Sequence, residues 1–392
     1  MFTSDFDYNL PTELIAQTPL EPRDSSRLLV LDRASGEVQH RHFTDILEYL
    51  RPGDVMVFNQ SRVIHGRLRG RRADTGGKVE FLLLREQGPG VWQAMAQPGR
   101  RLRPGAVVIL DPPGDDFAGE AGRPAEATLG GGESPLDPPF TKGGAGIYSA
   151  EVLASHDDGT KTIRLSPDVD PAALGQVPLP PYIRQRLEDP ERYQTVYAKD
   201  LGSAAAPTAG LHFTQQLLGR IQALGVEQVF VTLHVGLDTF RPVQGEDPAE
   251  HRIHTEYFEI DAEAAHTLNR AKREGRRVIA VGTTSVRVLE MAASSGPVDG
   301  AGGGGVDLKA QSGWTDLFIL PGHRFKLVDA MVTNFHLPRS TLLMLVSAFV
   351  ESGGPTRNPS TGSGRAVVLA AYQEAIAKGY RFYSFGDCMF TI

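Results

Sequence analysis

Five short segments between residues 68 and 167 alternate apolar and polar side chains and are separated by turn residues. They cover residues 78–85, 91–96, 106–110, 147–153 and 160–165. A period of two in closely spaced runs is typical of antiparallel strands, and several such strands close into a small barrel or sandwich. A chain with this stretch in its middle therefore has to carry a β-domain inserted into a larger one.

The residues on either side of this stretch alternate strand and helix patterns. We expect strands at 27–31, 54–64, 228–235, 277–281, 317–320, 328–334 and 380–385, and helices at 44–50, 214–224, 261–274, 286–293, 340–350 and 372–377. Such alternation is typical of an α/β domain. At 392 residues the chain exceeds one average core. The predicted fold class is α/β: a large mixed α/β domain, residues 1–67 plus 168–392, with an inserted small β-barrel domain, residues 68–167.

Composition limits the environment and the partners. A single cysteine, Cys388, rules out an internal disulfide and fits a reducing cytosol. The first ten residues lack the basic and apolar regions of a signal peptide, and the longest apolar run, 342–350, is too short to span a bilayer. We therefore expect a cytoplasmic protein. The net charge of −7 means that any nucleic-acid site has to be a local basic patch.

A loop rich in small residues, 193–213, is the first candidate ligand site. Pro207 has no backbone N–H, and Gly202 and Gly210 tolerate positive φ, so we expect no regular helix or strand from 202 to 211. The alanines among them allow close approach to the backbone, and Thr208 and His212 add polar groups. The same composition also suits a tight packing loop between two elements.

Polar residues follow four of the predicted strands, at 59–62, 234–239, 282–285 and 334–336. The carboxyl ends of strands in α/β folds lie at one edge, where ligands bind. The Gly-Thr-Thr-Ser turn at 282–285 opens a helix, whose unpaired N–H groups can hold a carboxylate or phosphate. Ordinary helix capping explains the same residues equally well.

Four histidines lie near these turns: His212, His234, His254 and His336. Their placement favours a proton-transfer site, although each one alone is more often a hydrogen-bonded structural residue. The sequence contains no His-Glu-x-x-His or Cys-His pattern, so we expect no metal site.

Arginines cluster at the start of the predicted barrel and within it. Arg67, Arg69 and Arg71 alternate, so on a strand they share one face, and Arg100 and Arg101 begin a second cluster. Such clusters suit phosphate groups of a nucleic acid, although solvated strand faces look the same.

Long sequence blocks, rather than one short motif, connect the chain to a known family. They include LPPYI (179–183), YQTVYAKDLGSAAAPTAGLHFT (193–214), EHRIHTEYFEI (250–260), VGTTSVRVLE (281–290) and TDLFILPGHRFKLVDAMVTNFHLPRSTLLMLVSAF (315–349). Together with shorter blocks near both ends, and in this order, they resemble the S-adenosylmethionine:tRNA ribosyltransferase-isomerase family. The resemblance covers nearly the whole chain except the Gly- and Pro-rich stretches 111–146, 294–312 and 352–365. It departs at Asp238, where the family usually has glycine, and at Ala204, where valine is common.

The resemblance implies an activity in queuosine biosynthesis. S-adenosylmethionine would be the co-substrate, without a metal, and its ribosyl part would pass to 7-aminomethyl-7-deazaguanine at the wobble position of a tRNA. The sugar would be isomerised to give epoxyqueuosine, with release of adenine and methionine. The implied fold, a large α/β domain with an inserted β-barrel, agrees with the change of pattern at 68. We expect a monomer whose partner is this tRNA.

Site roles follow as expectations. The candidate catalytic residues are Thr208, His212, His234 and His336. The candidate contacts to S-adenosylmethionine or the modified base are Asn59, Ser61, Arg62, Tyr193, Ala206, Pro207, Ala209, Gly210, Thr239, Gly282, Thr283, Thr284, Ser285, Arg287 and Asn334. The candidate tRNA contacts are Arg67, Arg69, Arg71, Arg100 and Arg101. A non-catalytic RNA-binding module and a nucleoside-processing transferase that never meets RNA are the competing hypotheses.

Overall fold

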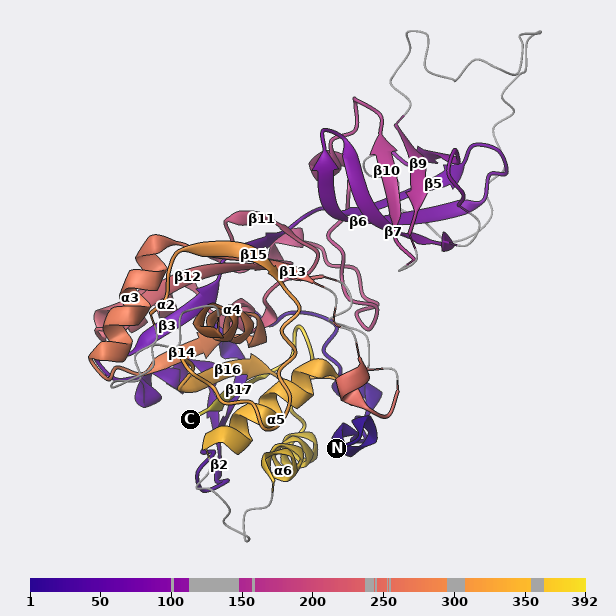
Figure 1. The fold of residues 1–392 in the computed structure, drawn as a ribbon. Helices are drawn as coiled ribbons and strands as arrows, with labels where there is room; N and C mark the ends of the chain where they lie inside the picture. Colours follow the sequence, from indigo (N-terminus) through magenta and orange to yellow (C-terminus); the bar gives the residue numbers. More distant parts are fainter. Residues whose placement is uncertain are drawn as a thin grey trace, which may run out of the picture. The chain divides into compact units, whose positions relative to one another are not determined.

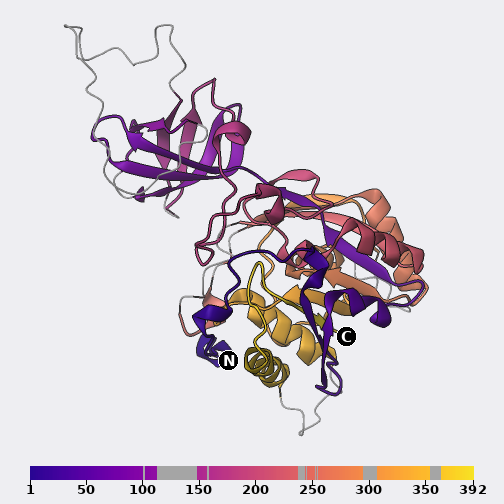
Figure 2. The same cartoon turned by 180° about the vertical axis from the view of Figure 1, so that it is seen from behind.

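A computed structural model describes residues 1–99, 102–112, 148–156, 159–236, 243, 245–251, 253, 255–294, 307–353 and 363–392. It contains two compact units, Met1–Ile64 with Leu179–Ile392, and His65–Pro178 (Figures 1 and 2). The first is a mixed α/β unit around a large sheet, and the second is a closed β-barrel. The predicted fold class is confirmed. The assignment of 1–67 plus 168–392 and of 68–167 as domains stays a prediction.

The barrel unit is closed by six strands in the order β10-β7-β6-β5-β8-β9, and all neighbours are antiparallel. Their bounds are β5 Arg67–Arg72, β6 Lys78–Gly88, β7 Val91–Gln97, β8 Val107–Leu110, β9 Ser149–Ser155 and β10 Lys161–Leu165. Alternate residues point inward, so Val79, Phe81 and Leu83 of β6 are buried. The one-turn helix α1, Pro171–Leu174, follows. Of the barrel strands, β5 was not among the predicted ones. Arginines occupy four of its six positions, so its sequence lacks a clear alternation of apolar and polar residues.

The α/β unit has a nine-stranded sheet in the order β15-β13-β12-β3-β14-β16-β17-β1-β2. Its strands are β1 Arg27–Leu31, β2 Val38–His42, β3 Val55–Asn59, β12 Glu227–His234, β13 Glu256–Ile260, β14 Val278–Val281, β15 Gln311–Thr315, β16 Ala330–Asn334 and β17 Cys388–Thr391. The four central strands, β12, β3, β14 and β16, are parallel, so their carboxyl ends share one edge as predicted. A separate two-stranded sheet pairs β4, Ser61–Val63, with β11, Asp200–Ser203.

Helices cover both faces of the sheet (Figure 1). They are α2 Gln215–Ala223, α3 Ala262–Arg273, α4 Thr283–Ser294, α5 Thr341–Gly353 and α6 Gly364–Ala377, with the 3-10 helices η1 Thr3–Phe6, η2 Thr12–Leu14, η3 Arg23–Ser25, η4 Phe43–Tyr49, η6 Pro190–Tyr193, η7 Thr208–His212 and η9 Pro248–Glu250. Successive strand residues point to opposite faces. Val55 and Val57 of β3 therefore pack with α3, α4, α5 and α6, whereas Met56 and Phe58 pack with α2, η4 and η7.

Four local predictions were wrong. The strand expected at 317–320 is replaced by β15 at Gln311–Thr315, an edge strand whose half-exposed sequence lacks a strong apolar pattern. The closing strand expected at 380–385 is a buried turn, in which Tyr383 has φ +71°, and β17 follows it. The helix expected at 44–50 is the 3-10 helix η4. The irregular stretch expected at 202–211 contains the end of β11 and all but the last residue of η7.

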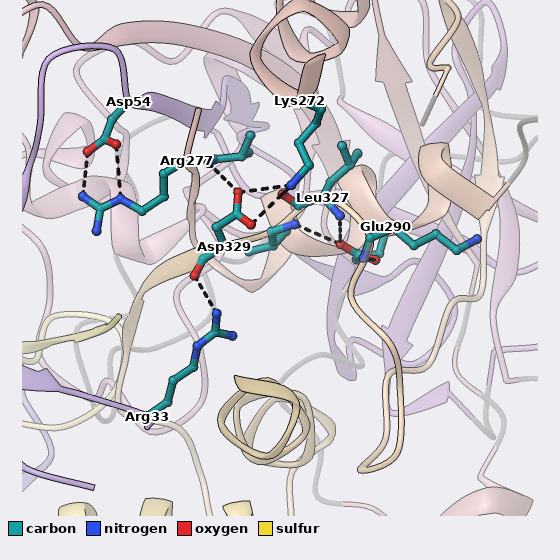
Figure 3. Close-up of polar contacts among 10 residues, drawn as sticks. Arg33, Asp54, Lys272, Arg277, Glu290, Leu327 and Asp329 are labelled. Carbon is teal, nitrogen blue, oxygen red and sulfur yellow. Dashed lines mark hydrogen bonds and ion pairs between the residues drawn. The ribbon is translucent and has the colours of Figure 1, made fainter. Parts of the chain in front are cut away.

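Partly buried ion pairs tie the amino-terminal ends of the central strands together (Figure 3). Asp54, just before β3, pairs with Arg277, just before β14, at 2.6 Å. Asp329, just before β16, accepts the Val278 N–H at 2.8 Å and pairs with Lys272 of α3 at 3.2 Å. These contacts fix the strands at the edge opposite to their carboxyl ends, where the polar turns lie.

Candidate active site

A pocket of about 620 Å³, counted with the open space at its mouth, lies at the carboxyl ends of β14 and β16. It is lined by Tyr182, Ala206, Pro207, Thr208, Ala209, Val235, Gly282, Thr283, Thr284, Thr333, Asn334, Phe335, His336, Leu337, Ser340, Leu342, Tyr383 and Ser384. Three of the predicted groups meet here: the small-residue loop, the turn that opens α4, and the polar end of β16. Segments far apart in the sequence therefore build one concave, partly polar site.

The turn between β14 and α4 brings two threonines to this pocket. Gly282 has φ +87°, a conformation that glycine adopts readily, and its N–H is bonded to Val332 O at 2.7 Å. Helix α4 starts immediately after it, so Thr283 and Thr284 belong to a first turn whose N–H groups carry partial positive charge. The Thr284 Oγ1 atom is buried and has no hydrogen-bond partner among the described residues. An unpaired buried hydroxyl beside a helix start suits a polar, anionic ligand group.

One part of the small-residue loop lines the pocket, and another part packs against the interior of the fold. Ala206, Pro207, Thr208 and Ala209 line the pocket. Gly210 instead packs inward, since a Cβ atom there would lie 2.0 Å from the hydroxyl of Tyr197. The ligand-site interpretation therefore fits one part of the loop, and the tight-packing alternative fits another.

His336 lines the pocket and its Nε2 lies 2.9 Å from Thr333 Oγ1. Its backbone is held independently of the ring: the N–H donates to the Tyr372 hydroxyl at 3.1 Å, and the carbonyl accepts from the Tyr8 hydroxyl. Burial lowers the pKa of His336 to about 3. The imidazole is thus neutral at pH 7, and burial disfavours its protonated form.

His212 lies at the end of η7, beside the pocket rather than in its wall. Its Nδ1 is 2.7 Å from Ser26 Oγ, and its ring interacts with the side chain of Asn334, which does line the pocket. Burial lowers the pKa of His212 to about 4, and the Asn334 contact offsets only part of that effect. Asn334 also donates from Nδ2 to Tyr383 O at 2.9 Å. Ser26 is therefore hydrogen-bonded to His212, whereas His212 Nε2 and Asn334 Oδ1 have no hydrogen-bond partner among the described residues.

The two lowered pKa values predict a loss of stability in mild acid. The unfolded chain binds a proton on each histidine below pH 6.5, whereas folded His212 and His336 stay neutral down to about 4 and about 3. The unfolded state therefore holds more protons between these values, and the free energy of unfolding falls as the pH falls from 6.5 to about 4, by up to about 1.4 kcal/mol per pH unit for each histidine. Urea denaturation of the wild type and of His212→Gln should show a shallower pH dependence in the variant. Equal slopes would contradict this assignment.

The pocket residues that sequence reasoning missed include Tyr182, Tyr383 and Ser384. The rings of Tyr182 and Tyr383 lie with their centroids 4.8 Å apart, and the Tyr182 hydroxyl is 2.7 Å from Ser384 Oγ. Tyr383 holds the positive φ that side chains rarely adopt, which is a conformation often found at functional sites. Their sequence signal was their place in two family blocks: Tyr182 lies in LPPYI, and Tyr383 and Ser384 lie in YRFYSFGDCMF (380–390), one of the shorter blocks near the ends of the chain. The resemblance gave none of these three residues a role.

Several predicted site residues do not line this pocket. Asn59 is fully buried and joins β3 to β12 through Leu233, and Arg287 pairs with Glu256. Arg62 pairs with Glu191, and Ser285 donates to Val281 O at 2.8 Å. The remaining ones that the structure describes elsewhere are Ser61, Tyr193, Gly210, His212 and His234. Thr239, Asp238, His254, Arg100 and Arg101 lie outside the described residues.

His234 ends β12 and stacks on Tyr257, with 5.7 Å between the ring centroids. Its ring faces Gly202, where a Cβ atom would lie 2.7 Å from Nε2. Gly202 has φ +150° and marks the register shift between β11 and β4. Burial lowers the pKa of His234. This histidine packs against β11 and does not line the pocket.

The arginine face of the barrel is partly neutralised. Arg67 and Arg69, on the same face of β5, both lie 3.3 Å from the carboxylate of Glu80. Arg71 on the same face is exposed.

In the part of the chain that the structure describes, no group of three or more His, Cys, Asp or Glu side chains could hold a metal ion. No helix among these residues is long and apolar enough to cross a membrane.

The sequence profile of the family described as "Queuosine biosynthesis protein" matches residues 3–391. The chain belongs to this family. Membership explains why the blocks that meet at the pocket, 206–209, 282–284 and 333–336, are those that carried the resemblance.

Curated members of the queuosine biosynthesis family match the full chain. Proteins named S-adenosylmethionine:tRNA ribosyltransferase-isomerase are 47% identical in Dehalococcoides mccartyi and 48% identical in Symbiobacterium thermophilum, and each match covers 100% of both chains. A crystal structure of S-adenosylmethionine tRNA ribosyltransferase from Thermotoga maritima is 34% identical, with a TM-score of 0.51, covering 99% of this chain and 100% of that one. The similarity therefore includes both units.

Proposed function

We propose that this chain is an S-adenosylmethionine:tRNA ribosyltransferase-isomerase. It transfers the ribosyl part of S-adenosylmethionine to 7-aminomethyl-7-deazaguanine at the wobble position of a tRNA and isomerises the sugar, giving epoxyqueuosine and releasing adenine and methionine. One observation carries the proposal. The family blocks at 206–209, 282–284 and 333–336 form one pocket, in a chain whose full-length relatives bear this name.

The reaction sets requirements for the pocket. The methionine carboxylate needs N–H donors, the leaving adenine needs a proton, and a base has to remove a proton next to the sulfonium. We assign the carboxylate to the first turn of α4, where the Thr284 hydroxyl is buried and unpaired among the described residues. We assign the adenosine to the wall formed by Ala206, Pro207, Thr208 and Ala209. Loss of the sulfonium drives the reaction, so no metal is required.

His336 is our candidate for moving the proton. It lines the pocket, its ring is oriented by Thr333, and its pKa is held low by burial. A ligand carboxylate nearby would raise that pKa, since an opposite charge favours the imidazolium. His212 is assigned a supporting role through Asn334, because it lies behind that residue and not in the wall.

The tRNA requires cationic contacts in addition to the pocket. We assign phosphate contacts to the arginine face of β5, on which Arg71 is exposed and Arg67 and Arg69 share one carboxylate. The enzyme would act as a monomer in the cytoplasm, where its tRNA substrate is found.

Adenine release tests the proposal directly. Purified protein with S-adenosylmethionine is expected to release adenine only when the added tRNA carries 7-aminomethyl-7-deazaguanine, and high-performance chromatography measures this. Unmodified tRNA is the matched control. Release without RNA would indicate a small-molecule transferase, and RNA binding without release would indicate a binding module; either result overturns the proposal.

A further inference from the structure

A second, smaller cavity lies beside the pocket. It is a half-open depression of about 290 Å³, a volume that includes the open space at its mouth, and its walls include Arg23, Ser26, His212 and Ser384. Ser384 lines both cavities. None of the residues lining the smaller cavity is acidic. A ligand in the main pocket could therefore extend toward a cavity that offers a cation and no carboxylate.

Two arginines are incompletely bonded: Arg23, which lines this cavity, and Arg381, which does not line it but acts electrostatically on His212. Arg23 donates from Nη2 to Glu191 O at 2.9 Å, and Arg381 donates from Nη2 to Thr18 O. The Nη1 atoms of both are buried and have no hydrogen-bond partner among the described residues. Both charges act on the ring of His212, which lines the cavity. Both residues are half-buried, and a buried guanidinium nitrogen without a hydrogen-bond partner is costly, so the site favours an anion.

The surrounding carboxylates do not supply that anion. Those whose charges act on Arg23 or Arg381 are Glu21, Asp189, Glu191 and Asp387. Each is already engaged. Glu21 pairs with Arg192, and Glu191 pairs with Arg62. Asp189 accepts one backbone N–H and Asp387 accepts two, at 2.8–2.9 Å.

We propose that this cavity binds a phosphate diester of the RNA substrate, adjacent to the nucleotide whose base occupies the main pocket. The inference rests on the proposed function and adds a backbone contact that belongs to the α/β unit. Arginine suits this ligand because its planar group donates to two phosphate oxygens. Because Ser384 lines both cavities, a phosphate in the smaller one would lie next to a nucleoside bound in the main pocket, as the phosphate attached to that nucleoside does. The methionine carboxylate of S-adenosylmethionine has the same anionic chemistry, and the experiment separates the two sources.

The experiment measures binding of an anticodon stem-loop RNA by fluorescence anisotropy over a range of salt concentrations. The variants are Arg23→Gln and Arg381→Gln, with Arg23→Lys to retain the charge. Arg273→Gln, on the exposed end of α3, is the matched control. Each glutamine variant is expected to weaken binding about tenfold, since a charge-assisted hydrogen bond is lost. It should also reduce the slope of log affinity against log salt by about 0.7, the value for one phosphate in a single strand.

The outcomes are distinct. Arg23→Lys should retain the wild-type salt slope, and Arg273→Gln should retain both slope and affinity. Unchanged slopes in both glutamine variants, with wild-type melting curves, would overturn the proposal. An increase in the KM for S-adenosylmethionine without a change in the salt slope would also overturn it, because the anion would then be the carboxylate. RNA binding requires no catalysis, so wild-type protein that binds RNA but releases no adenine would contradict the proposed function and leave the phosphate site supported.

Discussion

Replacing Glu290 by alanine is expected to lower the free energy of unfolding of the α/β unit by about 4 kcal/mol. The Glu290 side chain is fully buried in α4 and accepts the backbone N–H groups of Lys326, Leu327 and Val328 at 2.8, 3.0 and 3.2 Å (Figure 3). Alanine would leave three donors without an acceptor and would open a cavity. Each buried, unsatisfied donor costs about 1–3 kcal/mol.

Urea denaturation followed by helical circular dichroism measures this effect, because α2 to α6 all belong to the α/β unit. Glu263→Ala, at an exposed position in the first turn of α3, is the matched control and should change stability by no more than about 0.5 kcal/mol. Glu290→Gln keeps one acceptor oxygen and should lie between the two. A loss below about 1 kcal/mol in Glu290→Ala would show that the loop before β16 finds other acceptors.

Replacing His336 by alanine is expected to reduce the single-turnover rate of tRNA-dependent adenine release by about 10²–10⁴-fold, the usual contribution of a general acid or base. The loss should fall on kcat, since the ring is assigned to proton transfer and not to binding. The variant should fold, because the contacts of residue 336 to Tyr8 and Tyr372 use only its backbone.

His266→Ala, on the exposed face of α3, is the matched control for His336→Ala and should keep the wild-type rate. Thr333→Val removes the hydroxyl 2.9 Å from the His336 ring and should cost less than the loss of the ring itself. If His336→Ala retains the wild-type single-turnover rate while its melting curve is unchanged, proton transfer has to be assigned to another group.

Sequence periodicity located most elements because the central strands are buried on both faces. The apolar runs of β3, β14 and β16 have no polar interruption, and their polar turns had to follow at one sheet edge. The pattern failed where burial is one-sided or irregular. The edge strand β15 has no continuous apolar signal, and the aromatic run 380–385 reads as a strand although Tyr383 turns the chain.

The candidate site was only partly accessible to sequence reasoning. Asn59 and Arg287 have the same residue types as ligand-binding groups, yet both are used inside the fold, by Leu233 and by Glu256. Tyr383 and Ser384 gave no functional signal in the sequence apart from their place in a family block, since aromatic and hydroxyl side chains are common in ordinary turns.

The sequence by itself determined the family, the α/β class with its barrel, and the edge of the sheet at which polar turns collect. These depend on local patterns and on long blocks of identity. Only the tertiary structure decided which polar groups face the pocket and which satisfy one another. That choice depends on partners more than a hundred residues away, such as Ser26 for His212 and Leu233 for Asn59. A buried polar group is free for a ligand only where the fold provides no partner.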